Sequence, residues 1–257
     1  MRRAARCLAV LAGLLPAALP ASAFAEDVDL ELVLAVDISG SVDHVEARLQ
    51  RQGYLTALVD PQVVRVITSG ERRRIAVTYM EWAGAHFQNV VADWTVVRDM
   101  ATARAFAATI AEYPVSTERW TSISTAIDYA LGLFRANPHR GTRKVLDLSG
   151  DGRNNNGGPL APARARALAA GVKINGLPIV NDRPNPWGLP PPKDLDRYYF
   201  ERVIGGPGAF IVVARGFKSF GDAVKAKLVM EIAGPARRPP VLAQYGLARR
   251  NLAQRRP

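Results

Sequence analysis

The stretch LELVLAVDISGS, residues 30–41, decides the fold class of this chain. Its first seven residues, 30–36, form an almost continuous apolar run, which is typical of a strand that is buried on both faces. The chain then passes through Asp37-Ile38-Ser39-Gly40-Ser41, where Gly40 permits a sharp turn. A buried strand that turns at once toward a helix indicates an α/β fold.

The predicted helix after this turn is the first in a repeating pattern. Asp43 and Glu46 have the spacing of a capping box and predict a helix that reaches about Val59. Strands and helices then alternate, with strands predicted at 75–82, 90–97, 144–148, 172–179 and 210–214, and helices at 98–112, 122–136, 160–170, 194–204 and 217–232. The alternation predicts a doubly wound, mostly parallel sheet with helices on both faces, in which 90–97 is an edge strand.

The two ends of the chain differ from this α/β body, which we assign to residues 26–233. Residues 1–25 have a basic start, an apolar run at 8–19 and the small-x-small pattern Ala23-Phe24-Ala25, which together predict a removable signal peptide. We therefore expect an exported protein, periplasmic or secreted, without a transmembrane segment; a retained N-terminal anchor is the alternative. Residues 234–257 are rich in Arg and Pro and contain no acid, which predicts a mostly disordered basic tail.

The composition excludes several classes of protein. Hydrophobic residues make up 48% of the chain and charged residues 22%, which is typical of a globular protein and excludes intrinsic disorder. The net charge is +11, but much of it lies in the two ends and says little about the fold. Cys7 is the only cysteine and lies in the predicted signal, so we expect no disulfide, zinc-thiolate site or catalytic cysteine in the mature protein.

Oxygen-bearing side chains follow the predicted strand ends. Asp37, Ser39 and Ser41 leave the first strand. Thr121 stands where a helix begins, and Asp151 follows another strand. A doubly wound sheet brings such segments to one carboxyl edge, where two carboxylates and three hydroxyls would suit a hard divalent cation such as Mg²⁺. The alternative is that these hydroxyls cap turns and helix starts, and that Asp151 is a turn residue.

These residues resemble the metal-ion-dependent adhesion site (MIDAS) of the von Willebrand factor type A (vWA) domain. They match the family's Asp-x-Ser-x-Ser motif, second-loop threonine and third-loop aspartate, in the order Asp37, Ser39, Ser41, Thr121 and Asp151. The resemblance covers roughly residues 28–232, extends to a group of exported bacterial A-domain-like proteins and implies a Rossmann-like α/β fold. It also implies that the hydroxyls hold Mg²⁺ directly or through water, with Mn²⁺ or Ca²⁺ as alternatives. The aspartates would act largely through water, and an Asp or Glu of a protein partner would complete the coordination.

One departure from the family pattern lies in the second loop. Arg119 and Trp120 precede Thr121, where the family often has glycine, which predicts a stiffer loop with a bulkier rim. Trp82 and Trp120 are candidate contact residues, although core packing is the favoured role for Trp82. The stretch 184–192 holds five prolines and predicts an extended surface loop.

Other candidate ligands have weaker support in the sequence. Asn154 to Asn156 suggest a calcium loop, but Arg153 occupies a would-be ligand position and no glutamate closes the loop, so a polar turn is the better interpretation. His44, His86 and His139 are widely separated and have no metal-binding or catalytic spacing. We expect all three histidines at the surface.

The favoured function is a binding module that engages an acidic group on a protein partner through the bound cation. Because the sequence lacks a nucleophile elbow, a phosphate-binding glycine loop and a paired-histidine zinc motif, we predict no enzyme activity. One alternative is a metal-dependent hydrolase, with Glu81 as a conceivable general base. Another is a structural domain whose basic tail, 234–257, binds anionic polymers. No specific nucleic-acid partner is expected.

Overall fold

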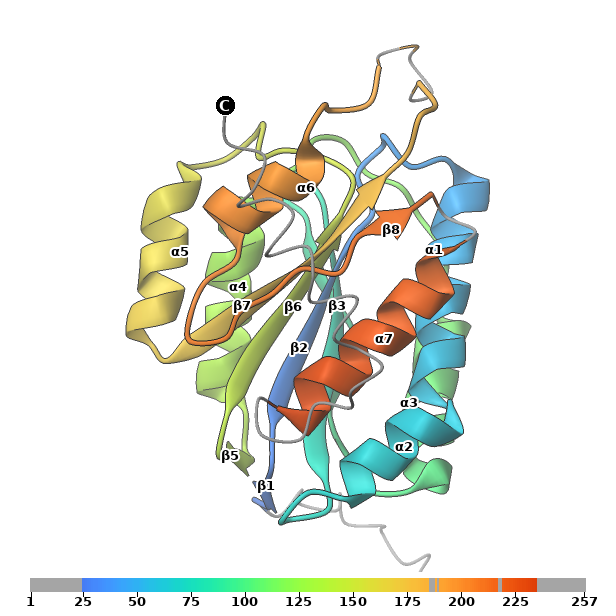
Figure 1. Cartoon of the computed structure of the whole chain (residues 1–257), viewed down its shortest axis with the longest axis vertical. Coiled ribbons are helices and arrows are strands. Elements are labelled where there is room, and N and C mark those ends of the chain that lie inside the picture. Colours follow the sequence, from blue (N-terminus) through green and yellow to red (C-terminus); the bar gives the residue numbers. More distant parts are fainter. Residues whose placement is uncertain (1–24, 185–187, 189, 217–218, 235–257) are drawn as a thin grey trace, which may run out of the picture.

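A central sheet divides the molecule into two helical layers, as the computed structural model shows (Figure 1). Within the residues that the structure describes, 25–184, 188, 190–216 and 219–234, this sheet has six strands in the order β4-β3-β2-β6-β7-β8. All neighbours are parallel except β4, which runs antiparallel to β3 at one edge. The strands are β2 (Glu31–Asp37), β3 (Ile75–Trp82), β4 (Gln88–Val97), β6 (Lys144–Gly150), β7 (Val172–Val180) and β8 (Ala214–Arg215). A separate parallel pair joins β1 (Asp27–Val28) to β5 (Arg140–Gly141).

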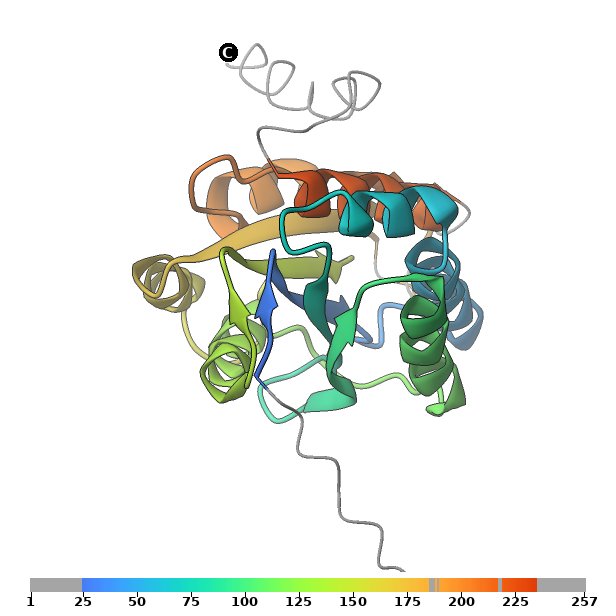
Figure 2. The same cartoon turned by 90° about the horizontal axis from the view of Figure 1, so that it is seen from below.

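Helices cover both faces of this sheet (Figures 1 and 2). One face carries α1 (His44–Leu58), α2 (Pro61–Thr68), α3 (Met100–Glu112) and α7 (Phe220–Ala233). The other carries α4 (Ile123–Ala136), α5 (Leu160–Ala169) and α6 (Leu195–Tyr198), which continues into a π-helical turn (Tyr199–Val203). The predicted doubly wound, mostly parallel α/β fold is confirmed, with the edge strand where the sequence placed it.

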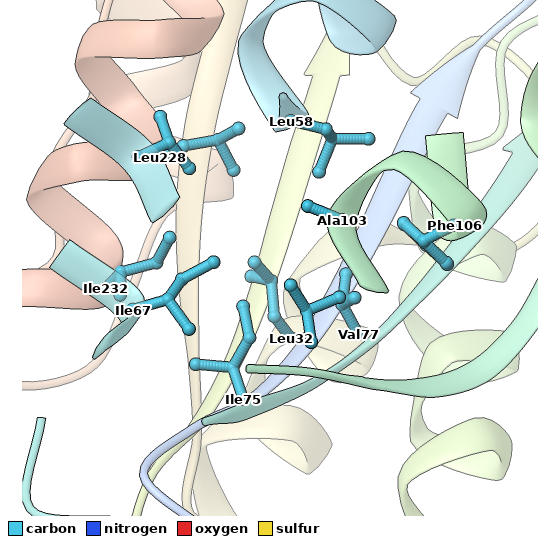
Figure 3. Close-up of a pocket in the computed structure, with 11 residues that line it drawn as sticks. Leu32, Leu58, Ile67, Ile75, Val77, Ala103, Phe106, Leu228 and Ile232 are labelled. Carbon is cyan, nitrogen blue, oxygen red and sulfur yellow. The ribbon is translucent and has the colours of Figure 1, made fainter. Parts of the chain in front are cut away.

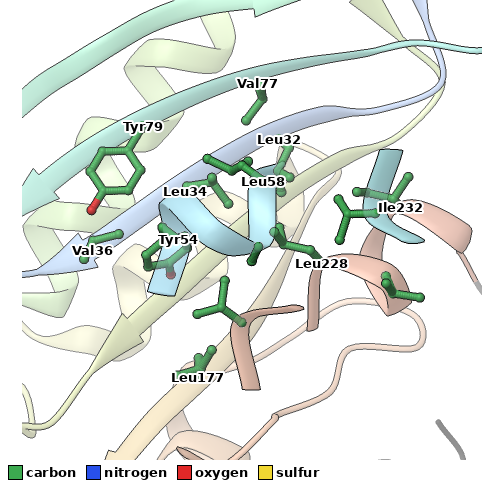
Figure 4. Packing of buried hydrophobic residues seen from close by; sticks show 14 of the residues in the cluster. Leu32, Leu34, Val36, Tyr54, Leu58, Val77, Tyr79, Leu177, Leu228 and Ile232 are labelled. Carbon is green, nitrogen blue, oxygen red and sulfur yellow. The ribbon is translucent and has the colours of Figure 1, made fainter. Parts of the chain in front are cut away.

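Strand β2 lies inside the sheet, between β3 and β6, and every one of its residues is buried. Its alternate side chains enter two separate apolar cores: Leu32 and Leu34 pack under α1 and α7, whereas Val33 and Ala35 pack under α4. Figure 4 shows the first of these cores around Leu32, Leu34 and the edge-to-face pair Tyr54–Tyr79, whose ring centroids are 5.4 Å apart. Apolar side chains on both faces explain why the sequence run is nearly continuous.

Local capping accounts for the start of α1. Asp43 Oδ1 accepts hydrogen bonds from the backbone N–H groups of Val45 and Glu46, each at 2.8 Å, and Glu46 Oε2 accepts from the N–H of Asp43 at 3.2 Å. The predicted capping box is therefore present. The sequence analysis missed α2, although Asp60 caps its first turn and Pro61 occupies its first position.

Two further predicted elements differ in extent from the observed ones. The strand expected at 210–214 is replaced by the short strand β8 (Ala214–Arg215), because residues 210–213 make only one isolated β-bridge to β7, between Ile211 and Gly176. The helix expected at 194–204 is split between α6 and the π-helical turn. The predicted start of the last helix, at 217 and 218, lies outside the described residues.

Ionic groups are buried in the first core beside β6. Lys227, on α7, pairs with Asp147 of β6 and with Glu231 of α7, the latter at 2.7 Å, and all three side chains are excluded from solvent. Asn175 Nδ2 donates to Glu231 Oε1 at 2.9 Å. A single ammonium group thus lies between two carboxyl groups inside the protein. We call these three residues, Asp147, Lys227 and Glu231, the core triad.

The same core contains a small apolar void between the sheet and its helices (Figure 3). Its volume is about 10 Å³, and its lining includes Leu32, Leu58, Phe106 and Leu228. A void of this size and polarity offers no hydrogen-bond partner to a water molecule. The void is therefore a feature of side-chain packing and does not have the polar groups of a binding site.

Several predictions concern segments beyond these layers. Residues 1–24 and 235–257, which hold nearly all of the predicted signal peptide and basic tail, lie outside the described residues, as do 185–187 and 189 of the proline-rich stretch. Among the described residues, no helix combines the length and apolar character needed to cross a membrane.

Candidate functional site

Two of the predicted site segments meet where β2 and β6 end, at the upper edge of the sheet in Figure 1. The backbone N–H of Ser39 donates to Asp37 Oδ1 at 2.8 Å. Ser39 Oγ lies 3.1 Å from Ser41 Oγ, which donates to Asp151 Oδ1 at 2.6 Å. The backbone N–H of Ser39 and the two hydroxyls thus form a row of polar groups between the two carboxylates.

Thr121 reaches this edge from the loop that precedes α4. A Cβ on Gly152 would lie 2.9 Å from Thr121 Oγ1, so the threonine hydroxyl faces the backbone just after Asp151. Ser41, Thr121 and Asp151 line one pocket of about 230 Å³. The structure thus gathers Asp37, Ser39, Ser41, Thr121 and Asp151 at one edge of the sheet.

Backbone hydrogen bonds hold the loops in this arrangement. The N–H of Glu118 donates to the carbonyl of Ile38 at 2.8 Å, and Glu118 also forms a bridge with Ser39. The N–H of Asn155 donates to the carbonyl of Thr121 at 2.9 Å. The loop before α4 is thereby joined to both of the other loops.

Three consecutive asparagines strengthen these links, a role that the sequence analysis missed. Each side-chain oxygen accepts a hydrogen bond from a backbone N–H of another segment: Asn154 from Ser124 at 2.9 Å, Asn155 from Thr121 at 2.8 Å and Asn156 from Ala85 at 2.7 Å. The asparagine run that we interpreted as a polar turn therefore also fixes neighbouring loops. The run follows Asp151 directly, and this position beside a candidate loop was the signal available in the sequence.

Tyr199 is a second residue that sequence reasoning missed. It lies in the π-helical turn after α6, its side chain is fully buried, and its hydroxyl has no hydrogen-bond partner. A Cβ on Gly150 would lie 2.7 Å from both Tyr199 Oη and Asp37 Oδ2, and Asp37 Oδ2 is likewise buried and unpartnered. Gly150 thus leaves room for a tyrosine hydroxyl and an inner carboxylate on the same side of its backbone. Nothing local to Tyr199 in the sequence signals this placement.

Burial sets the protonation behaviour of the two aspartates. It raises the pKa of Asp37 well above its ordinary value, and the nearby negative charge of Asp151 raises that pKa further. Burial also raises the pKa of Asp151 to about 6, although the hydrogen bond from Ser41 opposes the rise. Among the described residues, no Lys, Arg or His forms an ion pair with either carboxyl group. Both groups therefore lack a compensating positive charge from the described part of the chain.

The donor set fits a hard divalent cation. The buried, unpartnered Asp37 Oδ2 and the adjoining hydroxyls supply only oxygen, which is the ligand atom that Mg²⁺ and Mn²⁺ favour. Within the described part of the chain, no three His, Cys, Asp or Glu side chains cluster closely enough to hold a metal ion by themselves. A cation here would consequently depend on serine and threonine hydroxyls and on water.

Other sequence candidates lie apart from this chemistry. Glu81, the conceivable base of a hydrolase, is buried in an ion pair with Arg51, so it is already engaged by a cation of the protein. Trp82 is fully buried in the core, as favoured, whereas Trp120 is 59% exposed. The backbone of Trp120 is left-handed, with φ of 69°, beside the hydrogen bond from Gly84 N–H to the carbonyl of Arg119.

The histidines correct one sequence expectation. His44 and His86 are exposed, as expected. The prediction that His139 lies at the surface was wrong, because it is buried and its Nδ1 accepts a hydrogen bond from the backbone N–H of Glu26 at 3.2 Å. Its buried position comes from the pairing of β1 with β5, which brings residues 26 and 139 together across a long sequence separation.

The strand order, the two helical layers and the three loops at the carboxyl edge define a domain with the vWA fold, and solved structures share it. The chain is similar to proximal thread matrix protein 1 from the mussel byssus, solved with zinc in its MIDAS motif, with a TM-score of 0.58 and 16% identity over 82% of this chain and 49% of that one. It is similar to a von Willebrand factor type A protein from Catenulispora acidiphila, with a TM-score of 0.57 and 14% identity over 80% of this chain and 43% of that one. The chain thus spans less than half the length of these two proteins.

A shorter solved chain matches nearly end to end. BatB from Bacteroides thetaiotaomicron has a TM-score of 0.51 and 17% identity, over 79% of this chain and 98% of its own. No curated protein matches the chain in sequence. The chain belongs to the family described as "Protein of unknown function (DUF1194)", which matches residues 27–236.

Proposed function

We propose that the protein is an exported binding module that engages an acidic group on a protein partner through a divalent cation. The proposed ligands, direct or through water, are Asp37, Ser39, Ser41, Thr121 and Asp151. Mg²⁺ is the proposed ion, with Mn²⁺ or Ca²⁺ as alternatives. Export to the periplasm or beyond rests on the signal-like pattern of residues 1–25.

The observation that carries this proposal is the pair of buried carboxyl groups without a counter-charge. Asp37 is fully buried and Asp151 nearly so, and hydroxyls and backbone N–H groups are their only hydrogen-bond partners among the described residues. Burying paired carboxylates without a cation is unfavourable, and the raised pKa values of both groups express that cost. An external cation would lower the cost at this place.

Each side chain has a distinct role in the proposed site. Ser39, Ser41 and Thr121 present neutral hydroxyls, so they bind a cation without cancelling its charge. Asp37 and Asp151 supply the negative charge and orient these hydroxyls, as the bond from Ser41 to Asp151 illustrates. The bound ion would offer a coordination position to a carboxylate of the partner. The zinc in the MIDAS motif of the mussel protein supports such a site in this fold.

The alternative hypothesis, a metal-dependent hydrolase, has less support. Catalysis by a cation at this edge would need a free general base beside it. Glu81 is buried and one of its oxygens is paired with Arg51, so the candidate base already carries a protein counter-charge. The proposal that the tail binds anionic polymers concerns residues outside the described part of the chain.

Metal-dependent stability provides the test of the proposed function. Mg²⁺ or Mn²⁺ at a hundredfold excess over its dissociation constant should raise the free energy of unfolding by ~2.7 kcal/mol. Asp151→Asn should abolish this gain, and the matched surface variant Asp128→Asn, which alters only the exposed pair with Arg166, should retain it. Urea unfolding with each metal and with chelator measures the effect. If neither metal raises the free energy of unfolding of the wild-type protein, the proposal is refuted.

Partner capture then tests the second half of the proposed function. Mature wild-type protein and Asp151→Asn should be incubated with envelope extract, in Mg²⁺ and in chelator. We expect a partner to be recovered only by wild type and only with Mg²⁺. Equal recovery in chelator would remove the cation from the mechanism.

A further inference from the structure

The pocket beside the proposed cation site extends well past the oxygens that would hold the ion. Ser41, Thr121 and Asp151 form one wall. Arg153 and Arg183 line the same pocket, together with Ile179, Val180, Asn181 and the proline run 190–192. Because about 10–15 Å³ of such space is enough for one water molecule, a pocket of about 230 Å³ has room for more than one carboxylate.

Arg153 is held in place beside this pocket. Its guanidinium lies over the ring of Tyr198, 5.2 Å from the centroid, and its NH2 donates to the backbone carbonyl of Lys193 at 2.7 Å. A guanidinium has five N–H donors in a rigid plane, so one such bond leaves others for a ligand. The stacking and the carbonyl contact fix this plane before any ligand arrives.

Arg183 contributes a second guanidinium from the loop after β7. Its NH2 donates to Glu46 Oε1 at 2.7 Å, although 73% of the arginine side chain remains exposed. Glu46 belongs to the capping box of α1, whose N–H and carboxylate contacts hold it in position. The ion pair therefore restrains the long, flexible side chain of Arg183 beside the pocket.

The charges of the pocket lining are unequal. Among the described residues that line it, Asp151 is the only acidic one, against the two arginines. In the proposed site, Asp151 serves the cation, so the described lining holds no further carboxylate for the two guanidinium groups, of which Arg183 is already paired with Glu46 and Arg153 with no acid. Planar guanidinium groups form strong paired hydrogen bonds with carboxylates.

We infer that the ligand of this site carries two acidic groups, one for the cation and a second for Arg153 and Arg183. This inference rests on the proposed function. The ligand class is a protein segment with two neighbouring Asp or Glu residues, which would enter the pocket rather than touch a flat surface. The second acid would distinguish such a partner from the many proteins that expose a single carboxylate.

Two capped synthetic peptides test this inference, one with a single aspartate between glycines and one with two adjacent aspartates. Calorimetry with Mn²⁺-loaded wild-type protein should show the two-acid peptide binding about tenfold more tightly than the one-acid peptide. In the double variant Arg153→Gln/Arg183→Gln, the two peptides should bind equally, because only the contacts to the second acid are lost. Affinity for the one-acid peptide should stay within about twofold of wild type.

Matched controls separate this result from a loss of fold or of the cation. Arg166→Gln removes one positive charge from a surface pair with Asp128, away from the pocket, and should keep the tenfold preference. Mn²⁺ affinity should be the same in all variants. If wild type shows no preference, binds neither peptide, or keeps its preference in the double variant, the two-acid ligand is wrong although the cation site stands. If Mn²⁺ itself does not bind, the proposed function and this inference fall together.

Discussion

Strand β6 leads to two buried aspartates that the protein treats in opposite ways. Asp147, within the strand, shares Lys227 with Glu231 in the core triad. Asp151, just past the end of the strand, is linked to Asp37 through the hydroxyls of Ser41 and Ser39 and the backbone N–H of Ser39, and no lysine or arginine among the described residues pairs with either aspartate. Where two carboxyl groups serve the architecture, the chain supplies its own cation. Where the described residues supply none, our proposal is that a cation from solution takes that place.

Removing the cation of the core triad should produce the largest effect and break this comparison most directly. Lys227→Met leaves the carboxylate of Asp147 buried without a counter-charge and removes the hydrogen-bond donor of Glu231, so we expect a loss of roughly 3–5 kcal/mol in the free energy of unfolding. Lys225→Met, two residues earlier on α7, removes only a partly exposed pair with Asp60 and should cost at most about 1 kcal/mol. Urea unfolding measures both. Equal losses would show that the core triad contributes nothing special.

The pH dependence of stability should be the next largest effect. Burial, helped by the charge of Asp147, raises the pKa of Glu231 to about 8 from an ordinary value of 4.5. Between these two values the folded protein retains a proton that the unfolded chain has lost, so the free energy of unfolding should fall as pH rises through this window, by on the order of a few kcal/mol.

Glu231→Gln should flatten this part of the pH profile, because a neutral amide cannot titrate. Glu201→Gln, which alters an exposed pair with Arg197, should leave the profile unchanged. The measurement is urea unfolding at intervals from pH 4.5 to 8 for wild type and both variants. If the free energy of unfolding of Glu231→Gln falls with pH as steeply as that of wild type, another group carries the proton that the folded protein retains.

Two buried tyrosines sharpen the comparison with a smaller effect. Tyr199→Phe removes the hydroxyl that lies near Asp37. Because groups that surround a metal ligand tune its affinity for the metal, we expect Mn²⁺ affinity to fall about tenfold, with stability nearly unchanged. Tyr54→Phe removes a hydroxyl that donates to Ser149 Oγ at 3.1 Å, and should cost about 1 kcal/mol of stability without affecting Mn²⁺. Calorimetry and urea unfolding distinguish the patterns. A loss of stability alone in Tyr199→Phe would give this hydroxyl a purely structural role.

The sequence predicted those elements whose signals are local. The apolar run of β2 reflects the burial of both faces of the strand. The capping box at Asp43 and Glu46 reflects contacts between residues three positions apart. By contrast, β8 was predicted too long because its length depends on how far an edge segment follows β7. α2 was missed although Asp60 and Pro61 carried a start signal, since its eight residues show little of the period of a longer helix.

The candidate site shows the same division between local and distant information. Asp37, Ser39 and Ser41 stand in one short motif, and topology alone placed Thr121 and Asp151 at the same edge. The roles of Asn154 to Asn156 and of Tyr199 depend on partners tens of residues away, which spacing does not reveal. His139 was misplaced for the same reason, because the contact that buries it comes from residue 26.

The asparagine links between the loops have a kinetic consequence. Because Asn154, Asn155 and Asn156 already join the loops through neutral hydrogen bonds, no slow closure of the chain needs to accompany ion capture. The speed of association should then be governed by how fast the incoming ion sheds its hydration shell. Mg²⁺, which releases water reluctantly, should therefore load more slowly than Ca²⁺ even where it is held more firmly.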